Sequence, residues 1–490
     1  MKILKRILLG LVVVIVLVVA LFLVCVGPWP VYTPSNFTEA EYYKTAVAAI
    51  RDNAAQSALE DAPRQLKAGW AVRIMTPNVG VPMGGYGARP DGKKSKGVRD
   101  ELKARAIAFS DGVDTVVVLG ADMLIIPPNI AAMTVEQVAA KTPLTSNDIY
   151  FSATHTHCGP GAFAPGLASK ISGGAYDPAV PQFLSMTFAD AIVEAYNAMK
   201  PAQMASGVID AEAYIRNRTR QAPVDNNLNY MVVEQEGGRR CYVVRWSAHP
   251  TIFGTRMMEF SAEFPGEMMR YVEEQTGANA MYLGGGLGSM SPRAADAPTD
   301  SEKVAQYGRT LGQLLLENTA QLEFMNYTEV ASVRVPVGVP APQARPLSPK
   351  WRLSPVASRI LGVPPEGWIQ GARVGNTILI GMPFDTSGEL TREWREQAAR
   401  EGWDLWVTSF AGAYLGYLSP DKYYYEVDDK GHLDYETGLM SWLGPQSEAY
   451  FATLMKEIID NFGEPFQTAQ AQPAAAAAPG DAVPAAAPAL

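Results

Sequence analysis

The sequence has few cysteines and few histidines. Three cysteines and four histidines occur among 490 residues. Cys25 lies in an apolar N-terminal run, so a single disulfide between Cys158 and Cys241 is the most that the remaining thiols could form. This count excludes a disulfide-based scaffold. Because histidine is so scarce, a cluster of histidines points to a functional site.

A strong positive charge is also missing. The formal net charge is −9, and residues of both signs are spread along the chain without a basic stripe. Proteins that bind nucleic acid normally carry such a stripe on one face. Nucleic acid is therefore not an expected partner.

Charge is absent altogether from Ile7 to Val26, which follow Lys2, Lys5 and Arg6. About 20 apolar residues suffice to cross a bilayer as a helix. Positive charge before the run keeps the N-terminus cytoplasmic, so the rest of the chain should be extracytoplasmic. We expect a transmembrane anchor over residues 1–30, with Trp29 at the membrane interface.

A cleaved signal peptide is the alternative interpretation of this segment. Such a peptide normally has a shorter apolar core that is followed by a small-residue cleavage site. Residues 23–30 form a poor site of that kind, and Val24 before Cys25 disfavours a lipidated cysteine. The sequence therefore favours an uncleaved anchor.

Composition divides the rest of the chain into three parts. Residues 38–60 have a helical composition and predict a stalk or docking helix within a linker over 31–66. Residues 67–467 are long enough for one large domain. Residues 468–490 are rich in alanine and proline, lack large apolar side chains to bury, and are predicted to be disordered.

Strand and helix patterns alternate within the large domain. A continuous apolar run at 115–119 predicts a strand that is covered on both faces. Further strands are predicted at 71–75, 149–153, 242–249, 378–382 and 406–410, and helices at 135–140, 183–199, 265–274, 304–316 and 450–462. Mixed alternation of this kind indicates the α/β class, with a mixed β-sheet core flanked by helices.

Three of the four histidines lie at the ends of predicted strands. His155 and His157 follow the strand at 149–153, and His249 ends the run at 242–249 before Pro250. Residues two apart face the same side of a strand, so His155 and His157 should project together if the strand continues through them. Neutral imidazole is a common metal ligand. The pattern favours a metal site over ordinary polar strand ends.

Eight motifs in order resemble the neutral/alkaline non-lysosomal ceramidases, over about residues 71–450. The most specific is Ser152-Ala-Thr-His-Thr-His-Cys-Gly-Pro-Gly161, which matches the family's SATHTHSGPG with Cys158 in place of serine. The other seven are Met83–Gly87, Asp100–Ala106, Asn217–Thr219, Ala248–Thr251, Ser261–Gly266, Gly286–Pro292, and Gly416–Tyr417 followed by Tyr425–Glu426. The resemblance implies a ceramidase-like catalytic domain over 67–467.

The resemblance also implies a zinc site. Carried over residue by residue, the ligands of Zn²⁺ are His155, His249, Asp385 and Tyr417. The carboxylate departs from the family, which usually has glutamate after Pro-Gly or Pro-Ala, so Glu389 is the alternative. Tyr417 would bind as a phenolate, which a cation makes accessible below the usual pKa of about 10.

The implied chemistry is hydrolysis of the N-acyl amide bond of ceramide or a related N-acyl lipid to a fatty acid and an amine. Zinc lowers the pKa of bound water to about 7 and so supplies hydroxide. His157 would exchange protons with the water or the leaving amine. Arg218 and Tyr425 resemble residues that contact the carbonyl oxygen or a substrate hydroxyl.

Ser261 matches a family serine linked to catalysis, although a serine before Pro265 could simply cap a helix. No Gly-x-Ser-x-Gly elbow surrounds Ser261, which weakens a serine-hydrolase interpretation. Glu263 and Asp122 are expected to position the site. Cys158 is a candidate ligand or nucleophile, but a half-buried filler is the expected role.

Two departures from the family concern the substrate. Ser289 replaces an aspartate of the glycine motif, which would remove a local contact. The chain also leaves no room for the C-terminal β-sandwich of typical ceramidases after Phe462. An esterase or lactonase on the same zinc site, and a decayed, membrane-anchored lipid-binding protein, therefore remain alternatives. The sequence does not define an oligomeric state.

Overall fold

The computed structural model describes residues 2–30, 36–54, 64–346 and 348–466. The tail predicted to be disordered, residues 468–490, lies outside the described residues, as do parts of the predicted 31–66 linker.

An eight-stranded mixed sheet forms the larger of two central layers. Its strand order is β13-β11-β10-β8-β3-β5-β6-β7. The two outer pairs, β11 with β13 and β6 with β7, are parallel, and the pairs between them are antiparallel. In sheet order the strands are β13 Asn279–Gly284, β11 Arg240–Trp246, β10 Asn227–Gln235, β8 Lys200–Asp210, β3 Lys67–Ile74, β5 Lys103–Ser110, β6 Thr115–Ala121 and β7 Ile149–Ala153.

A second sheet of four strands has the order β16-β18-β19-β21. It is antiparallel except for its last pair, in which β19 and β21 run parallel. Its strands are β16 Val330–Gly338, β18 Glu366–Val374, β19 Thr377–Gly381 and β21 Asp404–Thr408.

The two sheets pack face to face because successive residues of a strand point to opposite faces of its sheet and are apolar on both faces. In β5, Ile107 and Phe109 lie in the core between the sheets, together with Trp406 of the second sheet. Ala106 and Ala108 of the same strand lie in the core beneath the helices. This period of two is the geometry of a strand, and it gives each sheet two buried faces.

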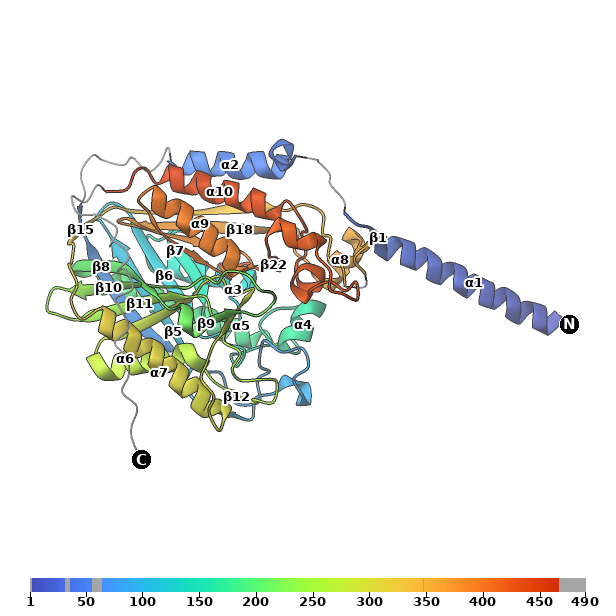
Figure 1. Cartoon of the computed structure of the whole chain (residues 1–490), viewed down its shortest axis with the longest axis horizontal. Helices are drawn as coiled ribbons and strands as arrows, with labels where there is room; N and C mark the ends of the chain where they lie inside the picture. The colour runs from blue at the N-terminus through green and yellow to red at the C-terminus, as the bar shows by residue number, and fades with distance from the viewer. Residues whose placement is uncertain (1, 31–35, 55–63, 347, 467–490) are drawn as a thin grey trace, which may run out of the picture.

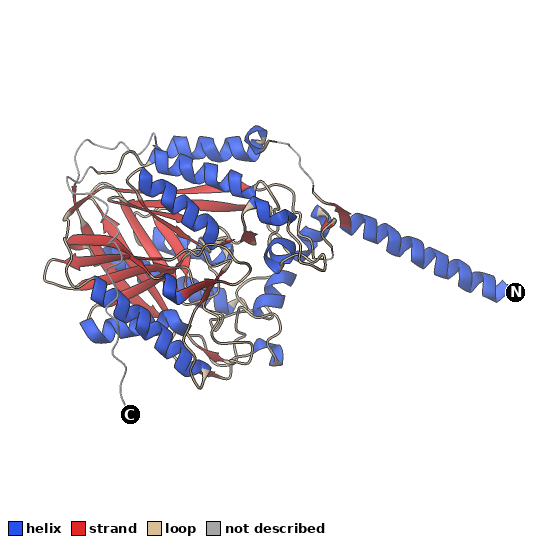
Figure 2. Ribbon diagram, viewed as in Figure 1, coloured by secondary structure: helices blue, strands red, loops and turns tan. Residues whose placement is uncertain are grey.

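Helices cover both outer faces, which gives four layers (Figure 1). The large sheet is covered by α3 Pro128–Ala139, α5 Ala179–Asn197, α6 Glu263–Thr276 and α7 Asp300–Asn318. The small sheet is covered by α2 Glu41–Ala54, α9 Gly388–Arg400 and α10 Ser447–Asn461. Figure 2 shows the strands enclosed between these two groups of helices.

Short elements connect the layers and build the rim of the molecule. The helices among them are α4 Leu167–Gly173 and α8 Pro355–Leu361, and short turns of helix span Asp421–Tyr425 and Glu436–Met440. Five two-stranded pairs join β1 Val26–Pro28 to β17 Trp351–Leu353, β2 Arg64–Gln65 to β15 Tyr327–Thr328, β4 Gly97–Val98 to β12 Glu259–Phe260, β9 Ile215–Asn217 to β14 Met290–Pro292, and β20 Asp385–Thr386 to β22 Tyr417–Leu418.

The predicted fold class is confirmed: the chain is an α/β protein with a large mixed sheet flanked by helices. The apolar run at 115–119 lies within β6 and is buried on both faces, as the pattern predicts. The division of the strands into two stacked sheets was not predicted, because strand patterns do not reveal which strands share a sheet.

The N-terminal apolar run forms one helix, α1 Lys2–Cys25, which projects from the body (Figure 1). Within the described residues it is the one helix that is long and apolar enough to cross a membrane. Its end is held by β1, which pairs with β17. Trp29 follows β1, and its indole packs beneath the guanidinium of Arg345, 3.6 Å from the ring centre.

Helix α2 lies in the segment predicted as a stalk or docking helix. Its apolar residues Ala46, Val47 and Ile50 are buried against β16 and α10. This contact makes α2 part of the outer helix layer, which corresponds to the docking alternative.

The two cysteines of the body are free and buried. Cys158 lies in the core beneath the helices, whereas Cys241 lies in the core between the sheets. The disulfide that the sequence left open is therefore absent, and the predicted filler role fits the burial of Cys158.

The core between the sheets should dominate the stability of the domain. Phe109→Ala removes a buried ring from this core, and large-to-small changes of this kind cost about 3–5 kcal/mol. Val113→Ala, in the exposed turn after β5, should change the free energy of unfolding by less than about 0.5 kcal/mol. Urea denaturation of both variants in detergent solution measures the difference. Equal losses would contradict the two-sheet core.

Candidate metal centre

The candidate site lies where parallel strands of both sheets end. The turn after β7 carries His155 and His157, and the loop after β11 carries His249. The sheets meet at this end, since the Ser409 amide, just after β21, donates to the carbonyl of Gly284 at 3.0 Å. The carboxyl ends of parallel strands are the usual place for sites in α/β proteins.

The strand does not continue through the two neighbouring histidines. β7 ends at Ala153, and His155 has a positive φ of 64°. His155 and His157 were expected to project together if the strand continued through them. Because the strand ends before them, this expectation does not apply. A tight turn, rather than the pleat of a strand, directs both imidazoles to the same point.

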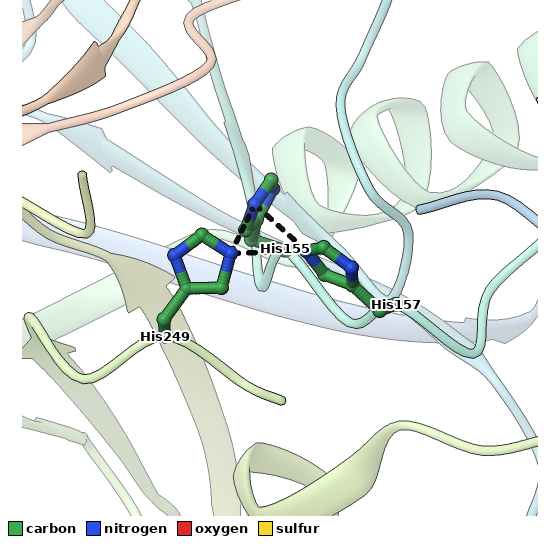
Figure 3. Close-up of side chains that lie close together, drawn as sticks. All are labelled: His155, His157 and His249. Atoms are coloured by element: carbon green, nitrogen blue, oxygen red, sulfur yellow. Dashed lines mark hydrogen bonds between the residues drawn. The ribbon is translucent and has the colours of Figure 1, made fainter. Parts of the chain in front are cut away.

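The three histidines converge through their Nε2 atoms (Figure 3). The Nε2 atom of His249 lies 3.0 Å from that of His155 and 3.0 Å from that of His157. The Nε2 atoms of His155 and His157 are 3.2 Å apart. Nitrogens held at about 2.05 Å from one tetrahedral zinc ion would be about 3.3 Å apart, so the separation of the His155 and His249 nitrogens fits a shared ion, with the His157 nitrogen next to it.

Backbone carbonyls fix the tautomer of two of these rings. The Nδ1 atom of His155 is 2.6 Å from the carbonyl oxygen of Leu124, and that of His249 is 3.2 Å from the carbonyl of Leu287. A carbonyl only accepts, so each Nδ1 carries the proton and each Nε2 presents a lone pair. Lone pairs that face one another repel unless a cation lies between them. Such second contacts are typical of metal-binding histidines.

His157 differs in this respect. Its Nδ1 atom is buried and has no hydrogen-bond partner among the described residues. Its ring instead packs on Tyr86, with centroids 4.6 Å apart. The tautomer of His157 is therefore not fixed by the surrounding backbone.

Burial keeps all three imidazoles neutral. It lowers the pKa of His155 to about 3, and the charge of Arg218 adds to this effect. The pKa values of His157 and His249 are also well below their usual range, first because of burial and then because of neighbouring positive charge. Neutral imidazole is the form that binds metals.

Asp385 stands beside the histidine cluster. Its Oδ2 atom is 3.9 Å from Nε2 of His155 and 3.9 Å from Nδ1 of His249. Both carboxylate oxygens are buried and lack a hydrogen bond of normal geometry within the described residues. Burial raises the pKa of Asp385 to about 7, against the opposing influence of Arg218 and of the Tyr417 hydroxyl as a hydrogen-bond donor. A buried carboxylate next to imidazoles is a suitable further ligand.

Tyr417 reaches the site from the strand that neighbours Asp385. β20 and β22 pair in parallel, with Asp385 opposite Tyr417. The phenol is buried, which raises its pKa well above the ordinary value. Tyr417 is therefore a neutral phenol in the absence of a cation, as expected for a group that only a metal would ionise.

Glu389, the alternative carboxylate, is already occupied. Its Oε1 atom accepts from the side-chain amide of Asn217 at 2.7 Å. Its Oε2 atom accepts from the hydroxyls of Ser289 and Ser387. The saturated carboxylate of Glu389 and the position of Asp385 beside the histidines favour Asp385 as the ligand. Ser289, which replaces the aspartate of the family's glycine motif, therefore still makes hydrogen bonds at this position.

Arg218 contacts Tyr417 and is half-buried. Its Nη2 atom donates to the carbonyl of Gly288 at 2.9 Å and to the hydroxyl of Tyr417 at 3.3 Å. Burial opposes the charge, but the oxygens of Tyr417, Tyr435 and Asp385 outweigh it and raise the pKa of Arg218. A permanent positive charge therefore faces the site.

Ser261 braces the histidine turn. Its hydroxyl donates to Asp100 at 2.5 Å and accepts from the amide of Glu263 at 3.0 Å, at the start of α6. Its carbonyl accepts from the Thr156 hydroxyl at 2.7 Å, and its amide donates to the carbonyl of Cys158. These contacts join three of the sequence motifs, whereas the N-cap of α6 is Ala262 and not Ser261.

Glu263 and Asp122 occupy positioning roles. The Glu263 carboxylate accepts from the amides of Ile252 and Phe253, which follow His249. Its pKa is raised to about 7 by burial. The Asp122 carboxylate accepts from Arg105 at 3.1 Å and holds the end of β6 just before Leu124.

Tyr425 packs against the segment that follows α1. Its side chain is exposed, and its ring packs 5.4 Å from that of Trp29. Tyr435 lies close to the site: its ring is 5.7 Å from the guanidinium carbon of Arg218 and 6.2 Å from the ring of Tyr417. Sequence reasoning did not single out Tyr435, because it lies outside the recognised motifs.

Three further residues that hold the histidines were missed or left without a role. The ring of Phe410 stacks on His155 at 4.1 Å. Arg89 donates to the carbonyl of His157 at 2.8 Å. Gly85 has a φ of 107°, and an added Cβ would lie 2.7 Å from the His157 ring. The motif that contains Gly85 was a usable signal, whereas Phe410 and Arg89 had none.

A sequence profile described as "Neutral/alkaline non-lysosomal ceramidase, N-terminal" matches residues 66–230. The match confirms the resemblance to the ceramidase family. The matched segment includes His155, His157 and Arg218, whereas His249, Asp385 and Tyr417 follow it. No curated protein matches the chain.

Solved ceramidase structures share the fold. The crystal structure of a neutral ceramidase from Pseudomonas aeruginosa has a TM-score of 0.71 at 17% identity, and the match covers 84% of this chain and 76% of that one. A structure described as a ceramidase complexed with C2 has a TM-score of 0.71 at 16% identity and covers 84% and 77%. At these identities the likeness shows a common fold.

Metal content tests the histidine cluster directly. We expect His155→Ala and His249→Ala to lose bound metal, because both remove a nitrogen whose lone pair is fixed toward the centre. His432→Ala is the matched control, since this histidine is exposed and pairs with Asp428. Elemental analysis after dialysis gives the stoichiometry. Metal that survives both substitutions would contradict the site.

Metal should also stabilise the fold. A ligand that binds only the folded state at 100 times its dissociation constant adds about 2.7 kcal/mol. Removal of metal with a chelator should therefore lower the midpoint of thermal unfolding, and re-addition should restore it. The His155→Ala variant should show no such response. An unchanged midpoint in the unsubstituted protein would count against a bound ion.

Proposed function

We propose that the protein is a zinc-dependent amidohydrolase that cleaves the N-acyl amide bond of ceramide or a related N-acyl lipid. The observation that carries the proposal is the convergence of three neutral imidazoles beside the buried carboxylate of Asp385. The ceramidase profile and fold support the amide as the bond that is cleaved.

His155, His249, Asp385 and Tyr417 are the proposed ligands. Nitrogen and carboxylate donors without a thiolate suit zinc. When bound, the ion lowers the pKa of water and provides a nucleophile at neutral pH. The carbonyls of Leu124 and Leu287 keep two of the imidazoles in the ligand tautomer.

His157 is the proposed proton carrier. Its Nε2 atom faces the other two histidines, and its Nδ1 atom has no fixed partner. A group that takes a proton from water and gives it to the leaving amine must change protonation without breaking a structural hydrogen bond. The unfixed tautomer of His157 suits that role, whereas the fixed rings of His155 and His249 suit ligation.

Arg218 is the proposed stabiliser of the developing oxyanion. Its guanidinium is held in place by the Gly288 carbonyl and by Tyr417, and its charge is permanent. Preorganised donors of this kind stabilise a transition state without having to reorganise. Tyr425 and Ser261 remain proposed contributors, Tyr425 toward the substrate and Ser261 through the histidine turn.

A lipid substrate fits the proposed location of the enzyme. Helix α1 would anchor the chain in a membrane, with the catalytic domain on the extracytoplasmic side because positive residues precede the helix. The substrate and the enzyme would then share one bilayer.

A hydrolysis panel tests the proposed bond specificity. Detergent-solubilised full-length protein should release fatty acid from an N-acyl sphingoid lipid, and His155→Ala should abolish the release. The matched ester of the same acyl chain separates an amidohydrolase from an esterase. Cleavage of the ester alone would replace the proposal with esterase activity, and no turnover of either by the metal-loaded protein would overturn it.

The role of Arg218 predicts a change in kcat. Arg218→Lys keeps a positive charge but loses the fork that contacts both Gly288 and Tyr417. Loss of one oxyanion donor typically lowers kcat by about 100- to 1,000-fold. We expect a loss of that order with little change in KM and no loss of metal. A raised KM with unchanged kcat would instead assign Arg218 to substrate binding.

A further inference from the structure

The junction between α1 and the body is fixed by hydrogen bonds. Val26 to Pro28 pair with Trp351 to Leu353, and the amide of Ser354 donates to the carbonyl of Cys25 at 2.8 Å. Ser354 in turn caps α8. The last turn of α1 is therefore joined to β17 and α8, and Figure 1 shows α8 at its base.

Large apolar side chains are exposed around this junction. Within the described residues, α4, β17 and α8 together expose Leu167, Ile171, Trp351, Val356 and Ile360. The most exposed is Ile360, at 69%. The elements contact each other, since α4 touches α8 and α8 touches β17. We call these five side chains the collar.

Basic residues accompany the collar, and acidic residues are absent from its segments. Lys170, Lys350 and Arg359 are exposed on the same three elements or directly beside them. Residues 166–174 and 348–363 contain no aspartate or glutamate. Aliphatic side chains, a tryptophan and lysine or arginine are the combination that proteins use at the headgroup layer of a bilayer.

The root of α1 contacts a segment that leads to the candidate site. Trp29, just after β1, packs against Tyr425. The guanidinium of Arg345 lies over Trp29 and donates to the carbonyl of Tyr424 at 2.7 Å. The segment from Tyr425 continues to the half-exposed Tyr435, whose ring lies beside Arg218 and Tyr417. The root of α1 therefore packs against the start of the segment that leads to Tyr435.

We propose that the collar docks on the headgroup layer of a bilayer that contains anionic lipid and so holds the root of α1 and the adjoining Tyr425 next to the membrane surface. The chain that emerges from the apolar helix α1 is hydrogen-bonded to β17 and to the cap of α8, and these two elements carry three of the five collar residues. The proposal rests on the proposed membrane anchor, and it gives the body a fixed orientation that an anchor on a flexible linker would not give.

Depth measurements on the full-length protein test the docking independently of catalysis. In a Cys25→Ser background, an environment-sensitive fluorophore is attached at Ile360→Cys and, as control, at Val113→Cys. Val113 is exposed in the turn after β5. Asp111 of this turn pairs with Arg64 of β2, which pairs with β15, and Figure 1 shows β15 on the side of the molecule opposite α1. The protein is placed in vesicles of phosphatidylcholine with phosphatidylglycerol.

The fluorophore at position 360 should shift to the blue, and lipids with spin labels near the headgroup should quench it several-fold more than the fluorophore at 113. Equal quenching at the two positions would overturn the proposal. The proposal would also be overturned if the fluorophore at 360 stayed blue-shifted in detergent and was not quenched by the spin-labelled lipids. A second protein copy would then cover the collar.

A second measurement separates docking from the proposed chemistry. The double substitution Val356→Glu and Ile360→Glu should lower cleavage of a long-chain N-acyl lipid in vesicles by about tenfold, because it places negative charge against an anionic surface. Val113→Glu is the control. Cleavage of a short-chain substrate in detergent should be unchanged in both. Failure of the proposed function would abolish all turnover but leave the quenching result intact, whereas equal vesicle activity in both variants would overturn docking alone.

Discussion

The mutual approach of three neutral imidazole nitrogens is the constraint on which the rest of the site depends. Two of these nitrogens present fixed lone pairs, since their rings donate the opposite N–H to the carbonyls of Leu124 and Leu287. Without a cation, the fixed lone pairs of His155 and His249, whose Nε2 atoms lie 3.0 Å apart in a buried site, repel each other. The surrounding structure must hold them together, and most of the recognised motifs serve that purpose.

The motifs form a continuous scaffold around the histidines. Asp100 holds Ser261, and Ser261 holds the backbone on both sides of His157 through Thr156 and Cys158. From the other side, Gly85 leaves room for the His157 ring. A site of this kind is preorganised, because each ligand is fixed by neighbours that are themselves hydrogen-bonded.

The two layers of sheet explain why one end of the molecule can supply so many ligands. The large sheet contributes the ends of β7 and β11, and the small sheet leads into the segments that carry Asp385 and Tyr417. The ends of both sheets meet at Ser409 and Gly284. A metal bound there would join the two sheets, so its removal should weaken the domain as well as inactivate it.

The sequence by itself determined the α/β class, the apolar N-terminal helix and the importance of the histidines. The pattern of apolar residues is enough for the first two. An unbroken apolar run such as 115–119 predicts a strand that is buried on both faces. An uncharged stretch long enough to cross a membrane predicts a helix. Scarcity of histidine and the order of the motifs were enough for the third. The resemblance also supplied Asp385 and Tyr417 as candidates, which no local pattern would have joined to residues more than 130 positions earlier.

Only the tertiary structure decided how these parts meet. It replaced the expected strand through His155 with a turn at positive φ, because convergence of two rings two residues apart needs the backbone to bend. It gave Glu389 hydrogen bonds from Asn217 and Ser289, set Asp385 beside the histidines, and placed Tyr435 beside Arg218. Such distinctions depend on which groups already have a hydrogen-bond partner, and partners distant in sequence become known only when the chain is folded.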